Sequence, residues 1–417
     1  SGFFTYAICW GINNGILDAK EYWPTVEAGW KGLMRCVDQN GKLCYVQPIG
    51  AAPNAFSKHT TQVYGTGAFM LAGAEVLKYQ LTHGQTETRV SLTNPSNFAR
   101  KQHLTHLPKN DWPKNMLILD ARSGEVVPHQ ITLHGVFVQL NFLPKETRIV
   151  RVVELEKKLP IQFEVRTMAR FVPERMDDFA WETDRIGFRT FGPTVALPKP
   201  KGEGLKTSGV DVWTKSTREM IVNKFYKNGS YHKDHGEGMD YFKVGSSAGC
   251  GAIGSFKDGK FTTAKNFLTS KILYTGPLAS EFELTYPGEA KPRMIAIGAG
   301  GWLYYTSAPS VENPAAGIVL HTKKAKVTIG ENYVTVWEEP HGEDGITGMA
   351  IVAPDGFSAK PREVNGQLVV PLKEPYYFAG ACWNKSGDFT TAAAWNAHVK
   401  QVPEKANVPI IHTILNR

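Results

Sequence analysis

The stretch GVFVQLNFLPKETRIVRVVEL, residues 135–155, decides the fold class. Apolar and polar side chains alternate along both of its halves, with the period of two that is typical of a β-strand with one buried face. Valine, isoleucine and phenylalanine, which are enriched in strands, fill most of the apolar positions. Proline, lysine and glutamate separate the halves. The stretch therefore predicts two strands joined by a turn.

The same period continues from about Thr86 to the end of the chain. Strand-like runs such as NMLILDA, NYVTVWEE and YYFAGACW alternate with turn sequences such as RSGE, KDGK, GEDG and VNGQ. The tail TTAAAWNAHVK predicts a closing helix. With many short strands and few helices between them, residues 86–417 are predicted to form one large antiparallel β-sandwich of the supersandwich type, so the protein is expected to be mainly β.

Residues 1–82 have a different period. The runs FTYAICWGINNGILD, YWPTVEAGWKGLMRCV and VYGTGAFMLAGAEVLKY place apolar residues three or four positions apart, which predicts three helices. Glycine and alanine are frequent in the third run and would allow its neighbours to approach closely. The sequence therefore predicts a separate helical unit before the β-sandwich.

Composition restricts the function classes. The 417 residues carry a formal charge of +8, but lysine and arginine are spread along the chain, which argues against a nucleic-acid binder and favours an acidic ligand such as a polyuronide. No window approaches twenty apolar residues, so no membrane span is predicted. The five cysteines form no CxxC pair. The opening SGFFTYAICWG has no signal-peptide pattern and suggests a processed or truncated product.

The segment YHKDHGEGMDYFKVG, residues 231–245, is the first candidate site. Glycines allow a sharply bent backbone, so that imidazole, carboxylate and phenol groups could converge. The candidate catalytic residues are Tyr231, His232, His235 and Tyr241. A divalent metal, zinc or calcium, could be held by His232, Asp234, His235, Glu237 and Asp240. The alternative is a solvated loop whose charges pair locally.

The segment RFVPERMDDFAWETDRIGFRTF, residues 170–191, is the second candidate site. If its end is a strand, the period of two places Arg185 and Arg189 on one face across a glycine, where two guanidinium groups could bind a carboxylate. A cross-strand ladder of salt bridges is the alternative. The candidate substrate-binding residues are Arg170, Arg175, Trp181, Arg185, Arg189 and Lys233. Trp302 is assigned to the core, and GCGAIG lacks the GxGxxG pattern, so no nucleotide cofactor is expected.

Two parts of the chain resemble known families. The runs SGFFTYAICWGINNGILD, DQNGKLCYVQPIG and VYGTGAFMLAGAEV resemble the last helices of glycoside hydrolase family 105, the unsaturated rhamnogalacturonyl and glucuronyl hydrolases. This resemblance implies that residues 1–82 are a remnant of an α/α toroid, without that family's catalytic aspartate. The runs RFVPERMDDFAWETDRIGFRTFGP, GVDVWTK and YHKDHGEGMDYFKVG resemble a bacterial domain, the domain of unknown function 4861.

Together the resemblances imply a bacterial enzyme of pectin-type or ulvan-type polysaccharide breakdown, periplasmic or secreted, that acts on oligosaccharide ends. The expected reaction is β-elimination at a uronic acid by a dehydratase or lyase. It needs cations for the carboxylate, a base for C5 and a proton donor for the oxygen that leaves C4. Two alternatives stay open: a glycoside hydrolase that uses two carboxylates, and a non-catalytic sugar-binding sandwich.

Overall fold

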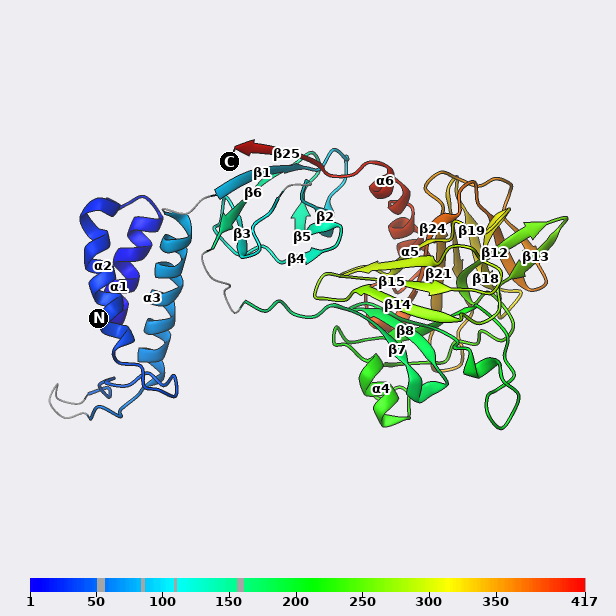
Figure 1. Ribbon diagram of the computed structural model, residues 1–417, viewed down its shortest axis with the longest axis horizontal. Helices are drawn as coiled ribbons and strands as arrows, with labels where there is room; N and C mark the ends of the chain where they lie inside the picture. Colours follow the sequence, from blue (N-terminus) through cyan, green and yellow to red (C-terminus); the bar gives the residue numbers. More distant parts are fainter. Residues whose placement is uncertain (51–56, 84–86, 109–110, 156–160, 417) are drawn as a thin grey trace.

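The computed structural model describes residues 1–50, 57–83, 87–108, 111–155 and 161–416. Figure 1 shows three bodies in a row: a helical hairpin region, a small β lobe and a large β lobe. The last strand of the chain returns from the large lobe to the small one. The protein is mainly β, and its paired strands run antiparallel, as the period of two predicts.

The helical region consists of the three predicted helices, α1 (Gly2–Asn13), α2 (Ala19–Met34) and α3 (Val63–Thr82). Asp18 caps α2 by accepting the backbone N–H of Lys20 at 2.8 Å. The small residues have the expected role, because a Cβ on Gly73 would lie 2.8 Å from the indole of Trp30. Among the described residues, no helix is both long enough and apolar enough to cross a membrane.

The small lobe packs a four-stranded sheet, in the order β25-β1-β6-β3, against a three-stranded sheet, β2-β5-β4. The two halves of the stretch 135–155 are strands, as predicted, but they pair in different sheets and face each other across one core. The strands are β1 (Glu87–Thr93), β2 (Arg100–His106), β3 (Met116–Asp120), β4 (His129–Thr132), β5 (Gly135–Phe142), β6 (Thr147–Glu154) and β25 (Ile411–Asn416).

The large lobe contains three sheets around a second core, in the orders β11-β10-β9-β8-β7, β14-β15-β16-β17-β24-β21-β20-β19 and β13-β12-β18-β23-β22. The first sheet is formed by β7 (Thr167–Val172), β8 (Asp178–Thr183), β9 (Gly187–Thr190), β10 (Val210–Lys215) and β11 (Gly238–Met239). The second is formed by β14 (Thr269–Tyr274), β15 (Ala279–Thr285), β16 (Arg293–Gly298), β17 (Leu303–Ser307), β19 (Lys326–Ile329), β20 (Tyr333–Trp337), β21 (Thr347–Val352) and β24 (Tyr376–Trp383). The third is formed by β12 (Cys250–Lys257), β13 (Lys260–Thr263), β18 (Pro314–Val319), β22 (Arg362–Val364) and β23 (Gln367–Pro371).

Short helices cover the large lobe. The predicted closing helix is α5 (Ala392–Val399). Its N-cap residue is Thr391, whose hydroxyl accepts the backbone N–H of Ala394. The others are α4 (Val222–Asn228), α6 (Val402–Asn407) and the 3₁₀ turns Pro173–Arg175, Thr194–Ala196 and Asn384–Ser386. The stretch 86–417 thus forms two β lobes, each with its own main hydrophobic cluster, where the sequence predicted a single sandwich.

Buried glutamines join the two β lobes. Gln130 of β4 donates to the carbonyl oxygen of Ala279 at 3.0 Å and accepts the backbone N–H groups of Leu278 and Ala279. Gln139 of β5 donates to the carbonyl oxygen of Ala299 at 2.8 Å. Because buried hydrogen bonds of this kind are costly to break, the lobes are held in a fixed relation.

Candidate functional site

Arg189 of β9 is the centre of a buried charge cluster in the large lobe. Its guanidinium Nη2 contacts the carboxylates of Asp211, its cross-strand neighbour on β10, and of Asp240, at 3.1 Å for the latter. Its Nη1 lies 3.9 Å from Asp178 Oδ2. All four side chains are at most 6% exposed. Three carboxylates therefore share one guanidinium away from water.

The glycine-broken segment forms the outer edge of this cluster. Gly238 begins β11 with φ +125°, and a Cβ there would lie 1.9 Å from the carbonyl oxygen of Thr214, so only glycine fits this position. The ring of Tyr231 stacks on Trp213 at 5.0 Å between ring centres. The Arg175 Nε donates to the hydroxyl of Tyr231 at 3.4 Å. This segment therefore contacts Arg175 and Arg189 of the second candidate segment.

His232 has a defined tautomer. Its Nδ1 lies 2.9 Å from the backbone carbonyl oxygen of Asp240, which can only accept a hydrogen bond, so Nδ1 carries the proton of the neutral ring. The lone pair is then on Nε2. Its side chain is 71% exposed. His232 is therefore an accessible imidazole held beside the phenol ring of Tyr231, 4.5 Å away between ring centres.

Burial shifts the acidities of the cluster. Burial raises the pKa of Asp178 to about 7, against the opposing attraction of Arg189. Burial also raises the pKa of Asp240, and the neighbouring charge of Asp211 adds to this. Oδ2 of Asp178 and Nη1 of Arg175 are buried and have no hydrogen-bond partner among the described residues. Perturbed carboxyl groups with unused hydrogen-bonding capacity are typical of functional sites.

Replacement of Asp178 with asparagine should flatten the dependence of stability on pH. Because the folded-state pKa is raised, the stabilisation from the protonated carboxyl is complete below about pH 4 and is lost as pH rises through about 7. Asparagine keeps the Oδ1 that accepts the N–H of Gly192 and cannot ionise. Urea unfolding measures the free energy of unfolding of the variant and of the unaltered protein. The difference, variant minus unaltered protein, should be larger at pH 8 than at pH 5 by more than about 1 kcal/mol. An equal effect at both pH values would contradict this assignment.

Other predicted site residues lie elsewhere. His235 is exposed and contacts Ser230, Lys233 is exposed, and the hydroxyl of Tyr241 bonds with Thr347 at 2.7 Å. Arg170 pairs with Glu174 beside Tyr226. Tyr241 lines a separate pocket of about 280 Å³ with Glu338 and His321, whose Nδ1 lies 2.6 Å from Glu338.

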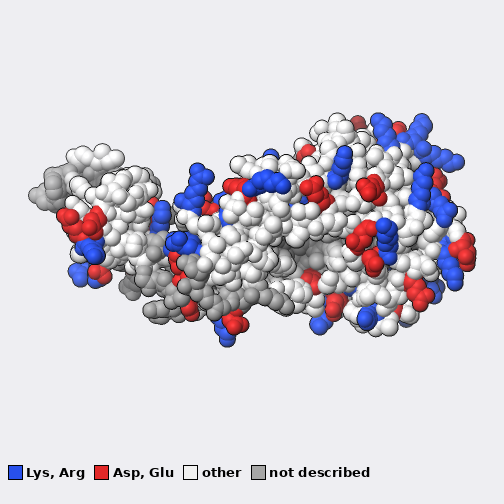
Figure 2. Space-filling model, turned by 90° about the horizontal axis from the view of Figure 1, so that it is seen from above, with Lys and Arg blue, Asp and Glu red and all other residues white. Residues whose placement is uncertain are grey.

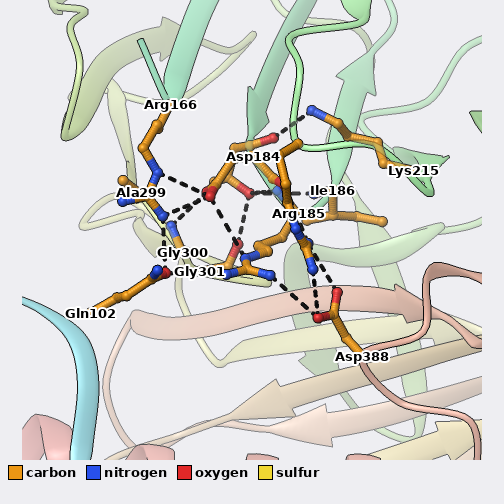
Figure 3. Close-up of polar contacts among 12 residues, drawn as sticks. Gln102, Arg166, Asp184, Arg185, Ile186, Lys215, Ala299, Gly300, Gly301 and Asp388 are labelled. Atoms are coloured by element: carbon orange, nitrogen blue, oxygen red, sulfur yellow. Dashed lines mark hydrogen bonds and ion pairs between the residues drawn. The ribbon is translucent and has the colours of Figure 1, made fainter. Parts of the chain in front are cut away.

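Two expectations about the arginine segment are wrong. Trp181 is 1% exposed within the core, because β8 is buried on both faces, and its indole cannot stack on a sugar. Arg185 does not share a surface with Arg189, because β9 begins only at Gly187 and the period of two does not extend to the turn before it. Arg185 instead contacts Asp388 at 3.3 Å and Gln102 at 3.1 Å (Figure 3).

The residues proposed for a metal do not converge. Oδ1 of Asp234 accepts the N–H groups of Gly236 and Gly238, and Glu237 pairs with Lys224. His232 and Asp240 are neighbours, but His235 turns toward Ser230. No group of three metal-binding side chains occurs among the described residues. Their geometry does not fit a metal, and we derive no chemistry from one.

Sequence reasoning missed the residues that support the cluster. Asp211 was not predicted as a site residue, although a carboxylate within the apolar run GVDVWTK is a signal for a buried ion pair. Glu182 is fully buried, pairs with Lys215 at 2.9 Å and accepts the N–H groups of Ile221 and Val222 at the start of α4. This pair anchors the segment that leads to Tyr231.

Comparison with known proteins divides the chain in two. The description "Domain of unknown function (DUF4861)" matches residues 92–411, and "Glycosyl Hydrolase Family 88" matches residues 1–80. The second match names family 88, whereas the sequence suggested family 105.

The relatives follow the same division. "Uncharacterized protein P7" of Formosa agariphila is 31% identical over 299 residues, which are 64% of this chain and 74% of that protein. The "Unsaturated 3S-rhamnoglycuronyl hydrolase" of Formosa agariphila is 49% identical over 80 residues, 19% of this chain and 21% of that protein. A protein of the same name from Alteromonas sp. (strain LOR) is 39% identical over 77 residues, 18% of this chain and 19% of that protein. The chain spans only about a fifth of each hydrolase.

Proposed function

Because this chain belongs to the DUF4861 family, whose description assigns no chemistry, we propose its function from its own residues: β-elimination at a uronic acid of an acidic oligosaccharide. The observation that carries the proposal is the placement of His232, Tyr231 and Arg175 at one edge of the Arg189 cluster. These residues supply the base, the proton donor and the cation that the reaction needs.

The proposed step follows from the roles of these groups. Arg175, which also pairs with Glu203 at 2.7 Å, supplies positive charge near the substrate carboxylate and lowers the barrier to removal of the C5 proton. His232 Nε2 takes that proton. The electron pair forms the C4=C5 bond as the C4–O bond breaks, and the leaving oxygen receives a proton from the hydroxyl of Tyr231. A leaving hydroxyl makes the enzyme a dehydratase, and a leaving sugar makes it a lyase.

The first 80 residues support the same pathway. The relatives matched there are named as hydrolases of an unsaturated rhamnoglycuronyl unit. Elimination from a uronic acid produces an unsaturated uronyl unit. This chain combines a segment similar to such hydrolases with a lobe proposed to carry out elimination, so both parts would belong to one degradation pathway. We propose a periplasmic or secreted location for it.

The test is incubation of the full chain with saturated uronyl oligosaccharides, followed by ultraviolet absorbance, reducing-sugar assay and mass spectrometry. Elimination should raise the absorbance through the new conjugated double bond. Dehydration should also lower the substrate mass by one water, whereas a lyase should divide the chain. New reducing ends without absorbance would indicate hydrolysis and overturn the proposal. The absence of any product from both unsulfated and sulfated uronyl oligosaccharides would also contradict it.

A further inference from the structure

A groove runs between the two β lobes, apart from the Arg189 cluster. Its volume is about 1020 Å³. One wall comes from β2, β5 and the turn after β5 in the small lobe. The other comes from the turn Gly300–Trp302, the segment Asp388–Phe389 and the helices α5 and α6. The groove is large enough for several sugar rings, because ligand pockets in proteins usually measure about 300–1,000 Å³.

Aromatic side chains form one side of the groove. The half-buried indole of Trp302 lies 4.9 Å, between ring centres, from both Phe389 and His398. Burial lowers the pKa of His398 to about 4, so its ring is neutral at pH 7 and continues the apolar surface. An indole with an apolar face and a polar edge is suited to pack against a sugar ring.

Cations outnumber carboxylates along the lining, with Lys101, Arg148, Arg185 and Lys405 against Glu146 and Asp388. Asp388 is already paired with Arg185 and Arg218. Arg185 lies 5.0 Å from the ring centre of Trp302, which places a guanidinium beside the aromatic surface. Among the described residues, no carboxylate lies within ion-pair distance of Lys101 or Lys405. The two ammonium groups could therefore receive acidic groups, beside a guanidinium that is already paired with Asp388.

The face of the molecule seen from above does not carry a broad excess of cations. Figure 2 shows lysine and arginine mixed with aspartate and glutamate over the face seen from above, without one continuous basic surface. A nucleic acid would need a longer run of phosphate contacts. The local excess within an aromatic groove instead favours a ligand with few, spaced negative charges.

The walls of the groove are held in place without a ligand. Arg166 donates to Gln102 Oε1 at 2.9 Å and pairs with Asp184, whose Oδ1 accepts the N–H of Gly300 at 2.7 Å (Figure 3). Gln139 donates to the carbonyl oxygen of Ala299 next to this turn. These contacts fix the turn that carries Trp302. A preformed site loses less entropy when its ligand binds.

We propose that this groove binds an acidic oligosaccharide, with a sugar ring against Trp302 and carboxylate or sulfate groups at Lys101 and Lys405. The proposal goes beyond the eliminating site and rests on the proposed function only for the class of ligand. The groove would hold the length of a glycan chain, whereas the Arg189 cluster would act on one uronic acid.

Isothermal titration calorimetry with the full chain tests the groove. The probes are a galacturonic acid tetrasaccharide, a sulfated tetrasaccharide and a neutral tetrasaccharide. At least one acidic probe should bind, more weakly as salt increases, and the neutral probe should bind at least tenfold more weakly. Trp302→Ala should weaken acidic binding at least tenfold, and Trp302→Phe, which preserves packing against Phe389, should weaken it less. Lys101→Gln with Lys405→Gln should weaken binding and reduce its dependence on salt.

The controls separate the groove from the eliminating site. Phe4→Ala and Lys260→Gln change an exposed aromatic and an exposed lysine elsewhere and should leave binding unchanged. His232→Ala should bind the acidic probe in the groove as the unaltered protein does, even though its kcat for elimination is lowered. Binding of only the carboxylated or only the sulfated probe supports the proposal and identifies the anion. The proposal is overturned if neither acidic probe binds at millimolar concentration, or if the Trp302→Ala and double lysine variants bind normally.

Discussion

Replacement of Arg189 with methionine should lower the free energy of unfolding by about 3–5 kcal/mol. The guanidinium is the shared partner of Asp178, Asp211 and Asp240, all of them almost inaccessible to water. Without it, these carboxylates would remain buried close together with no compensating charge at the centre. Methionine fills much of the same volume, so the loss would report on charge more than on packing.

Urea unfolding of the two proteins at pH 5 and pH 8 measures this effect. The loss should be smaller at pH 5, because buried carboxylates that have lost their cation bind protons in the folded state more readily than in the unfolded state. Arg122→Met is the matched control, since Arg122 is exposed, and should change stability by less than about 0.5 kcal/mol. A loss below about 1 kcal/mol for Arg189→Met would show that the cluster does not depend on its guanidinium.

Replacement of His232 with alanine should lower kcat for elimination by about 10²- to 10⁴-fold, the usual contribution of a general base. The free energy of unfolding should change little, because the imidazole is 71% exposed and its hydrogen bond to Asp240 lies at the surface edge of the cluster. Rates of absorbance increase at saturating substrate give kcat, and thermal unfolding of the same samples checks the fold.

Two further histidine variants make this result specific. His412→Ala removes an exposed imidazole on β25 in the other lobe and should leave kcat unchanged. His235→Ala should have a much smaller effect than His232→Ala, because His235 is exposed and its imidazole bonds with Ser230 at the surface. If both His232→Ala and His235→Ala retain full activity, neither imidazole is the base and the proposed mechanism is wrong.

The sequence predicts strands better than their partners. The period of two identified the strands within 135–155, yet β5 pairs with β2 and β4, whereas β6 pairs with β1 and β3. Alternation tells which side chains are buried, but pairing depends on contacts between residues far apart in the sequence. For the same reason, the division of residues 86–417 into two β lobes could not be predicted from local patterns.

The candidate site was predictable to the extent that its chemistry is local. Histidine, tyrosine and glycine within one segment predicted a candidate site, and in the structure Tyr231 of that segment contacts Arg175 and lies beside Arg189. The separation of Arg185 from Arg189 depends on where β9 begins, which alternation does not specify to within a residue. The burial of Trp181 depends on which sheets cover β8, a property of the whole lobe.

The position of β25 in the sequence affects how the chain folds during its synthesis on the ribosome. It completes the sheet of the small lobe by pairing with β1, and Ser91 and Thr413, 322 residues apart in sequence, are joined by a hydrogen bond. While the chain is being synthesised, β1 would present an open edge until the final strand emerges, long after its other neighbours are available. Newly made chains should therefore depend on chaperone protection of that edge, and loss of the last strand should make them prone to aggregate.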